Sequence, residues 1–144
     1  MIRGYVSAGS PFVPLRVSFE RLRTRDPRYD LQFLIDTGAA VSVIHPVDAT
    51  AIAIDFEGSF AGAPVETNLG IGGTARYQRE MSSLEFTQAD GTWSRYRFAL
   101  RIALPSASNA VLPSILGMDF IQHFRLTVSV REDRVELESL FDDA

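Results

Sequence analysis

Residues 31–44 read LQFLIDTGAAVSVI: an apolar run, a short polar segment and a second apolar run. The first run predicts a buried strand that ends at Asp36. A carboxylate at the end of a buried strand is unfavourable unless it is hydrogen-bonded, paired or protonated, so such a position usually serves chemistry. Gly38 lacks a Cβ and lets another backbone or a substrate approach this acid closely. Thr37 adds a hydroxyl beside it.

The tripeptide Asp36-Thr37-Gly38 could also form an ordinary surface turn, because Asp and Gly favour bends. A given tripeptide of this kind arises by chance in about a few per cent of chains of this length. Surface turns seldom lie between two runs that both have the pattern of core strands, however, and Val41–Ile44 is the second such run. The flanking sequence therefore favours a chemical site over a turn.

The composition predicts one soluble domain covering residues 1–144. There is no cysteine, so disulfides and thiolate metal sites are excluded. The net charge is −4 and there is no basic block, which argues against nucleic acid or an anionic membrane as a partner. Hydrophobic residues make up 46% of the chain but occur in short runs, and Met1–Tyr5 does not open a signal peptide. We expect a cytoplasmic protein.

Most segments have the two-residue alternation of β-strands. Between Val13 and Phe19 every second residue is apolar, and Tyr29–Ile35 forms the strand that precedes Asp36. In Trp93–Leu104 the apolar residues again share one face, and the arginines occupy the other face, which we expect to be solvated. Its partner is predicted to be Ser83–Thr87, because Asp90-Gly91 between them is a strong hairpin signal.

Two short helices and a final hairpin complete the prediction. Pro46 suits a first helical position and begins a helix to about Ala53. A second helix covers Met118–His123, with Asp119 expected to accept hydrogen bonds from the free amides at its start. Arg125–Val130 and Val135–Leu140 form the hairpin.

A glycine-rich segment, Leu69–Thr74, predicts the tip of a flexible hairpin. It lacks the Lys-Ser/Thr ending of a phosphate-binding loop and is not followed by a clear helix pattern. Its amides could hydrogen-bond the backbone of an extended peptide. Taken alone, the segment is equally compatible with a plain hairpin turn.

Together these features resemble the retropepsin-like family of aspartic proteases. The resemblance rests on the apolar strand, Asp36-Thr37-Gly38-Ala39, the glycine-rich hairpin and Ile115-Leu116-Gly117-Met118-Asp119-Phe120-Ile121, in this order, and spans roughly Pro11 to Leu140. It implies an all-β fold: a closed, mostly antiparallel β-barrel with one or two short helices. It also implies roles for individual residues: Asp36 is catalytic, Thr37, Gly38 and Ala39 support it, and Gly70, Ile71, Gly72 and Gly73 form a flap over the substrate. The segment Ile115–Gly117 would pass beside the active-site loop.

The chain departs from viral members of the family at two positions. Those members typically carry an acid where this chain has Ala40 and an arginine where it has Met118, and the two form an ion pair. The joint loss avoids a stranded buried charge and resembles cellular and bacterial relatives. A serine at position 39 can stabilise an ionised aspartate in pepsin-like enzymes, and Ala39 cannot, so we expect a mildly acidic to neutral pH optimum.

The resemblance implies an aspartic endopeptidase that works as a homodimer. Its chemistry requires two carboxylates that share one proton, and this chain supplies only Asp36. A twofold-related copy would supply the second, and Thr37 would hydrogen-bond across the dimer. The substrate would be an extended peptide, and Val135–Phe141 has the alternation of a strand in a shared terminal sheet. No cofactor and no metal are expected, since His45 and His123 have no metal-ligand spacing.

Two alternatives remain open from the sequence. The fold could serve as a catalytically silent dimerisation or peptide-binding module, because a fold alone does not fix an activity. A small ligand-binding β-barrel without relation to proteases would make the Asp36 loop accidental and predicts a monomer with an interior cavity.

Overall fold

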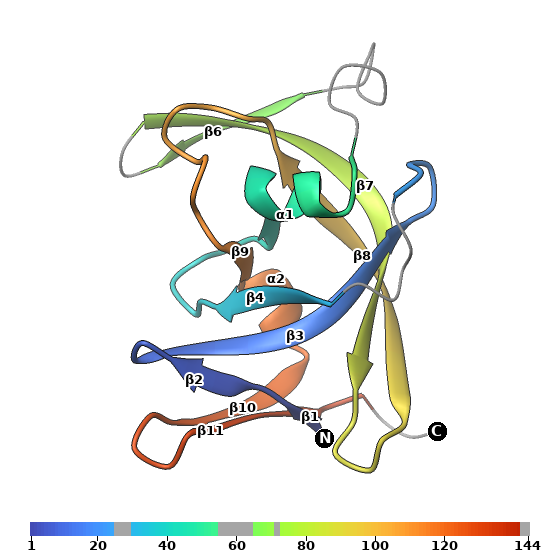
Figure 1. Ribbon diagram of the computed structural model, residues 1–144, viewed down its shortest axis with the longest axis vertical. Helices are drawn as coiled ribbons and strands as arrows, with labels where there is room; N and C mark the ends of the chain where they lie inside the picture. The colour runs from blue at the N-terminus through green and yellow to red at the C-terminus, as the bar shows by residue number, and fades with distance from the viewer. Residues whose placement is uncertain (25–29, 55–64, 71–72, 142–144) are drawn as a thin grey trace.

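A closed barrel of six strands forms the body of the molecule (Figure 1). The computed structural model describes residues 1–24, 30–54, 65–70 and 73–141. Around the barrel the strands follow in the order β3 (Ser10–Phe19), β4 (Leu31–Ile35), β9 (Ser114–Leu116), β5 (Val43–Ile44), β8 (Trp93–Ala103) and β7 (Gly73–Thr87). The barrel closes because β7 pairs back with β3, from Arg16↔Glu85 to Phe19↔Ser82. Two further strands extend the sheet, β2 (Tyr5–Ser7) beside β3 and β6 (Glu66–Gly70) beside β7.

The expected mostly antiparallel, all-β architecture with two short helices is confirmed. Among the described strands, only β4 with β9 and β5 with β8 pair in parallel. The helices are α1 (Pro46–Ala51) and α2 (Met118–Ile121). Both end two residues earlier than predicted. Ala53 has a positive φ of 62°, which stops α1, and β10 begins soon after α2, at Phe124.

A second, three-stranded sheet has the order β1 (Ile2–Arg3), β11 (Arg134–Ser139), β10 (Phe124–Ser129). The predicted final hairpin is therefore present, paired from Phe124↔Ser139 to Ser129↔Arg134. The outer edge of β1 is tied to the β7–β8 turn by a bridge between Ile2 and Gln88. On the opposite side, β10 pairs with no further strand among the described residues.

Alternating side chains fill the barrel as the sequence predicts. In β3 the side chains of Val13, Leu15, Val17 and Phe19 are buried. In β8, Arg95 and Arg97 lie outside and pair with Glu85 and Glu20, each at 2.6 Å, whereas Arg101 is half-buried. The partner of β8 is much longer than the predicted Ser83–Thr87. Its first half escaped prediction because polar side chains occupy the inward positions there: Gln78, Glu80 and Ser82 are all buried.

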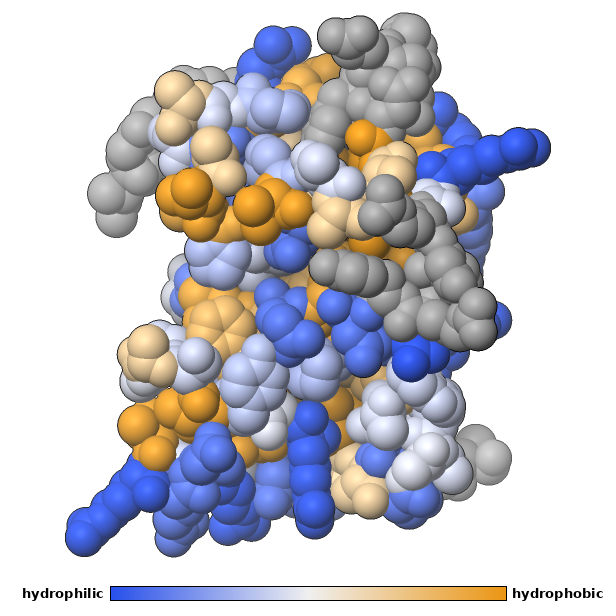
Figure 2. Space-filling view, in the orientation of Figure 1, coloured by the Kyte–Doolittle hydropathy of each residue, from blue (hydrophilic) through white to orange (hydrophobic). Residues whose placement is uncertain are grey.

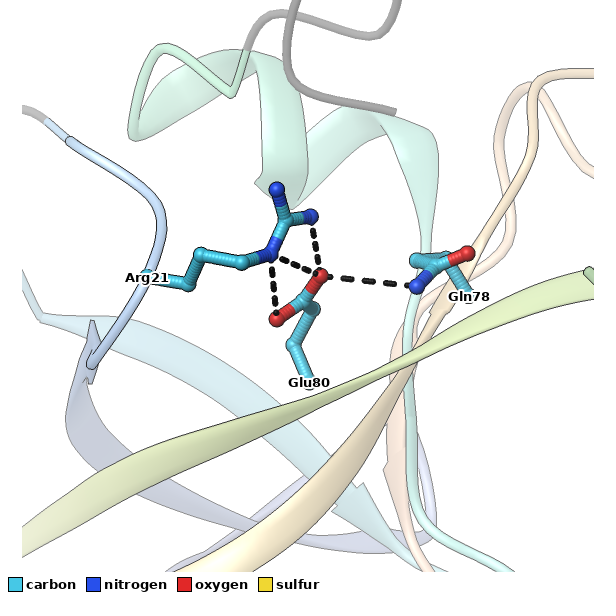
Figure 3. Close-up of polar contacts among 3 residues, drawn as sticks. All are labelled: Arg21, Gln78 and Glu80. Carbon is cyan, nitrogen blue, oxygen red and sulfur yellow. Dashed lines mark hydrogen bonds and ion pairs between the residues drawn. The ribbon is translucent and has the colours of Figure 1, made fainter. Parts of the chain in front are cut away.

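One of these inward side chains is charged and receives an arginine from a neighbouring segment (Figure 3). The Glu80 side chain is 7% exposed and accepts hydrogen bonds from Arg21 Nε at 3.0 and 3.2 Å. Arg21 Nη2 also contacts Glu80, and Gln78 Nε2 lies 3.4 Å from the same carboxylate. The arginine follows β3 in the chain, so the ion pair joins the end of β3 to the middle of β7.

Candidate active site

Asp36 directly follows β4, which pairs antiparallel with β3 and parallel with β9. Ile35 pairs in parallel with Leu116 of β9, and the Asp36 N–H donates to the Leu116 carbonyl at 3.0 Å. The backbone at Asp36 is therefore fixed by a strand that comes 80 residues later in the sequence. The Asp36 side chain is half-buried, while Thr37 and Gly38 are exposed.

The turn after Asp36 is built around its own carboxylate. The Gly38 N–H donates to Asp36 Oδ1 at 2.9 Å, and the Ala39 N–H donates to the Asp36 carbonyl at 3.2 Å. A Cβ at position 38 would lie 3.2 Å from Asp36 Oδ1, which is closer than most Cβ contacts. Glycine at this position thus donates a hydrogen bond and leaves the carboxylate accessible.

The segment from β9 into α2 lies against this loop, as the resemblance implies. The Met118 N–H donates to the Ala39 carbonyl at 2.8 Å, and the Asp119 N–H to the Ala40 carbonyl at 3.1 Å. Gly117 makes the approach possible, because a Cβ there would lie 2.5 Å from the Val41 oxygen. Five predicted residues therefore lie close together: Asp36, Thr37, Gly38 and Ala39 in the loop, and Gly117 in the segment packed against it.

The structure corrects the expected role of Asp119. Helix α2 begins at Met118, after the N-cap residue Gly117, and has no side-chain cap, so Asp119 does not cap its own helix. Its carboxylate instead accepts hydrogen bonds from Ser42, from the backbone N–H at 3.0 Å and from the hydroxyl at 2.7 Å. The prediction overlooked Ser42, whose only signal in the sequence is a polar residue in the apolar run Val41–Ile44.

A similar serine–aspartate pair lies nearby, between β9 and α1. Ser114 Oγ donates to Asp48 Oδ2 at 2.5 Å and accepts the His45 N–H at 3.0 Å. Both Ser114 and Ser42 are fully buried. Within the described part of the chain, neither Ser114 nor Asp48 hydrogen-bonds to residues 36–42, so this second pair fastens the helix to the strand, outside the Asp36 loop.

Ala40 and Met118, the positions where an ion pair was expected to be missing, both lie at the surface. Ala40 is exposed and Met118 is 38% exposed. Ala40 and Met118 lie close together where α2 contacts the Asp36 loop, because the Asp119 N–H donates to the Ala40 carbonyl. The surface beside the Asp36 loop is therefore uncharged at these two positions.

The ends of β6 and β7 at their hairpin lie on the same side of the barrel as the Asp36 loop in Figure 1. Gly70 pairs with Gly73 and closes the β6–β7 hairpin, while Ile71 and Gly72 lie outside the described residues. The segment between β8 and β9 runs on this side too, and Val111 in it is 87% exposed and Leu112 is 41% exposed. Figure 2 shows apolar side chains gathered on this part of the surface.

The two histidines lie apart and make structural contacts. His45 is buried, and its Nδ1 lies 2.6 Å from the Pro113 carbonyl. The His123 ring stacks on Phe141 at 5.2 Å between centroids. In the part of the chain that the structure describes, no three His, Cys, Asp or Glu side chains gather in a way that could hold a metal ion.

None of the helices among the described residues is long and apolar enough to cross a membrane.

The fold is shared with solved aspartic proteases. A retropepsin-like aspartic protease from Rickettsia conorii superposes with a TM-score of 0.58 and 16% identity, over 94% of this chain and 95% of that one. The EIAV protease complexed with the inhibitor HBY-793 gives a TM-score of 0.49 and 17% identity, over 82% of this chain and 90% of that one. No protein-family model and no curated protein matches the sequence. The chain thus has a retropepsin-like fold.

Proposed function

We propose that this chain is an aspartic endopeptidase that hydrolyses peptide bonds with the Asp36 carboxylates of two copies. The observation that carries the proposal is the Asp36 turn: a half-buried carboxylate, hydrogen-bonded to the Gly38 N–H at 2.9 Å and fastened by β9 and α2. This turn sits in a fold shared with a solved aspartic protease. Likeness of fold alone would not support an activity, so the proposal depends on the turn.

Two carboxylates are needed because the reaction moves two protons. One aspartate takes a proton from the attacking water, while the other donates a proton to the oxygen of the scissile carbonyl. The chain has one Asp-Thr-Gly sequence, so the second acid has to come from another copy. We therefore include a homodimer, with Thr37 at the contact between copies, in the proposed function.

The terminal sheet suggests where the second copy docks. Strand β11 is already paired on both edges, with β1 and β10, so it cannot also take a strand from a partner. Among the described strands of this sheet, β10 has a free edge, and apolar side chains lie on it and just beyond it: Val128 in β10 is 40% exposed, and Val130 in the following turn is 53% exposed. Val128 faces the same side as its buried partner Val135. A second β10 would cover it.

The proposed substrate is an extended peptide that lies between the Asp36 turn and the β6–β7 end. Extended peptides bind through their backbone groups, and the pockets beside them select alternate side chains. Gly70, Ile71, Gly72 and Gly73 are proposed to close over the peptide. Ala39 and the exposed residues of the segment between β8 and β9 would then lie beside it.

The test is cleavage of a diverse peptide library between pH 3 and pH 8 at high protein concentration. Asp36→Asn keeps the shape of the side chain and removes its ability to act as an acid or base, so it should abolish cleavage while the fold is kept. Glu132→Gln, which changes an exposed acid in the β10–β11 turn, is the matched control and should cleave normally.

Cleavage by Asp36→Asn at the native rate would contradict the proposal. No cleavage by the native chain, in a sample shown to be dimeric, would favour the alternative of a silent dimerisation or peptide-binding module. Such a module would keep its binding in Asp36→Asn.

A further inference from the structure

Asp119 makes an unusual set of contacts for an acid in the first turn of a helix. Both of its carboxylate oxygens accept hydrogen bonds from Ser42, 77 residues away in the sequence. Ser42 is fully buried, and its hydroxyl also accepts the Gly117 N–H at 2.9 Å. The Ser42 N–H and hydroxyl thus donate to Asp119, and the hydroxyl oxygen accepts from Gly117.

These bonds act on the loop that begins at Asp36. Five residues separate Asp36 from Ser42, and three of them, Thr37, Gly38 and Ala40, are exposed. Few packing contacts can therefore hold the loop from outside. The Asp119 carboxylate fixes its far end at Ser42, while the backbone bond from Asp36 to Leu116 fixes its near end. Between these ends, the Met118 and Asp119 N–H groups donate to the Ala39 and Ala40 carbonyls, so one segment holds the loop along its length.

We propose that Asp119 is a positioning residue, which sets the placement of the Asp36 carboxylate through Ser42. The expected effect on the cleavage rate rests on the proposed peptidase function, whereas the expected shift of the loop rests on geometry alone. Removing the carboxylate by Asp119→Ala leaves two buried donors on Ser42 without an acceptor, so the loop must shift to expose them to water. A displacement of about 1 Å at a reacting group can lower a rate by about a hundredfold.

Asn at position 119 should rescue most of the effect. Its Oδ1 can accept the Ser42 N–H, and its Nδ2 can donate to the Ser42 hydroxyl oxygen, so only the hydroxyl hydrogen loses its acceptor. The shape of the contact is kept and the negative charge is lost. An effect of the charge itself on Asp36 would instead make Asp119→Asn as impaired as Asp119→Ala.

Asp48 provides a matched control. It accepts a hydrogen bond from a fully buried serine, Ser114, and makes no hydrogen bond to residues 36–42 within the described part of the chain. Asp48→Ala should reduce stability in a similar way without moving the Asp36 turn. It therefore separates positioning from a general loss of stability.

Two measurements test the inference. The first is hydrogen exchange of the Asp36 and Gly38 amides, which report on the turn directly because they bond to Leu116 and to the Asp36 carboxylate. Exchange should accelerate in Asp119→Ala and remain native in Asp119→Asn and Asp48→Ala. The second is peptide cleavage per folded molecule, in which Asp119→Ala should lower kcat by about 10 to 100-fold and change KM by less than about twofold.

Native exchange at both amides in Asp119→Ala would overturn the inference, as would an Asp119→Asn variant that exchanges and cleaves like Asp119→Ala. If Asp119→Ala does not fold, Ser42→Ala removes the hydroxyl bond to Asp119, together with the bond from the Gly117 N–H, and carries the same expectations. If the native chain cleaves no peptide, the proposed function fails, and the exchange data alone decide whether Asp119 holds the turn.

Discussion

Gly117 is a residue at which the fold tolerates little change. A Cβ there would lie 2.5 Å from the Val41 oxygen and 2.8 Å from the Ala39 oxygen. Both are backbone atoms of the loop that follows Asp36, and backbone cannot move aside as a flexible side chain can. The glycine in the Ile115–Gly117 sequence therefore follows from the close approach of two chain segments.

We predict that Gly117→Ala destabilises the protein by about 2 to 3 kcal/mol, because the added methyl group overpacks a rigid contact. The measurement is urea denaturation at equilibrium. Gly91→Ala is the control: its φ of +85° strains an alanine, but no atom lies within 4 Å of the new Cβ. It should cost only about 1 kcal/mol. A larger loss for Gly91→Ala than for Gly117→Ala would contradict the close-approach argument.

The ion pair between Arg21 and Glu80 predicts an asymmetry between its two partners. The Glu80 side chain is 7% exposed and that of Arg21 is 52% exposed, so only the arginine can be hydrated when its partner is lost. Arg21→Ala should therefore destabilise the protein by about 3 kcal/mol, because it strands a buried charge. Glu80→Gln should cost about 1 kcal/mol.

The control for the Arg21 variant is Arg125→Ala, at an exposed pair. Arg125 and Glu138 lie 3.4 Å apart with side chains 67% and 52% exposed, so the loss should be below about 1 kcal/mol. Urea denaturation of the three variants checks the series. Equal losses of unfolding free energy in Arg21→Ala and Arg125→Ala would show that the burial of Glu80 does not increase the cost of losing its partner.

Sequence patterns and structure agree best at the scale of the strand, wherever one face is apolar. The alternations in β3 and β8 were predicted because every second side chain enters the core. The first half of β7 was missed, since Gln78 and Glu80 face inward. The Asp36 turn could be located from its apolar flanks. The contact of Asp119 with Ser42 could not, because a tertiary bond replaced the local cap that the sequence favoured.

Two carboxylates that pair with arginines predict a dependence of stability on pH. A hydrogen bond from Arg97 of β8 holds the pKa of the Glu20 carboxyl below its ordinary value of 4.5. A hydrogen bond from Arg134 lowers the pKa of Glu136 in the same way. A carboxylate with a lowered pKa in the folded state stabilises the fold above its unfolded pKa, and the contribution is lost as the pH falls through the folded value.

We therefore predict that stability falls as the pH drops below about 4.5, and that the variant carrying both Glu20→Gln and Glu136→Gln loses part of this dependence. Urea midpoints at pH 7, 5 and 3.5 check this in low salt, where surface charge pairs are least screened. An identical pH dependence in the native chain and the double variant would exclude these two pairs as its source.

At the scale of the whole molecule, the terminal sheet leaves one edge for a partner. An antiparallel partner strand related by a twofold axis continues the sheet with its apolar face on the same side, because paired residues share a face. Val128 would then lie opposite an apolar residue of the partner's β10. Exposed apolar surface on a free edge strand is unusual in a monomer, because such an edge invites further pairing.

Val128→Asp should weaken the proposed dimer at least about tenfold in Kd, since it places a charge in the apolar seam without a partner. Val47→Asp is the control, at a residue of α1 that is 53% exposed and away from β10. Sedimentation velocity over a range of concentrations measures both. A dimer that survives Val128→Asp and is lost in Val47→Asp would move the interface elsewhere.

The position of β9 also determines how much of the chain has to be made before the proposed active site can form. This strand lies between β4 and β5 in the barrel, yet it is made about 70 residues after them. A ribosome-bound chain that has not yet extruded Gly117 has the whole Asp36 turn, but neither the strand nor the helix that fasten it. Long-range contacts of this kind form late in folding. Under the proposed function, a newly made chain would therefore be unable to cut its neighbours until β9 and α2 had left the ribosome.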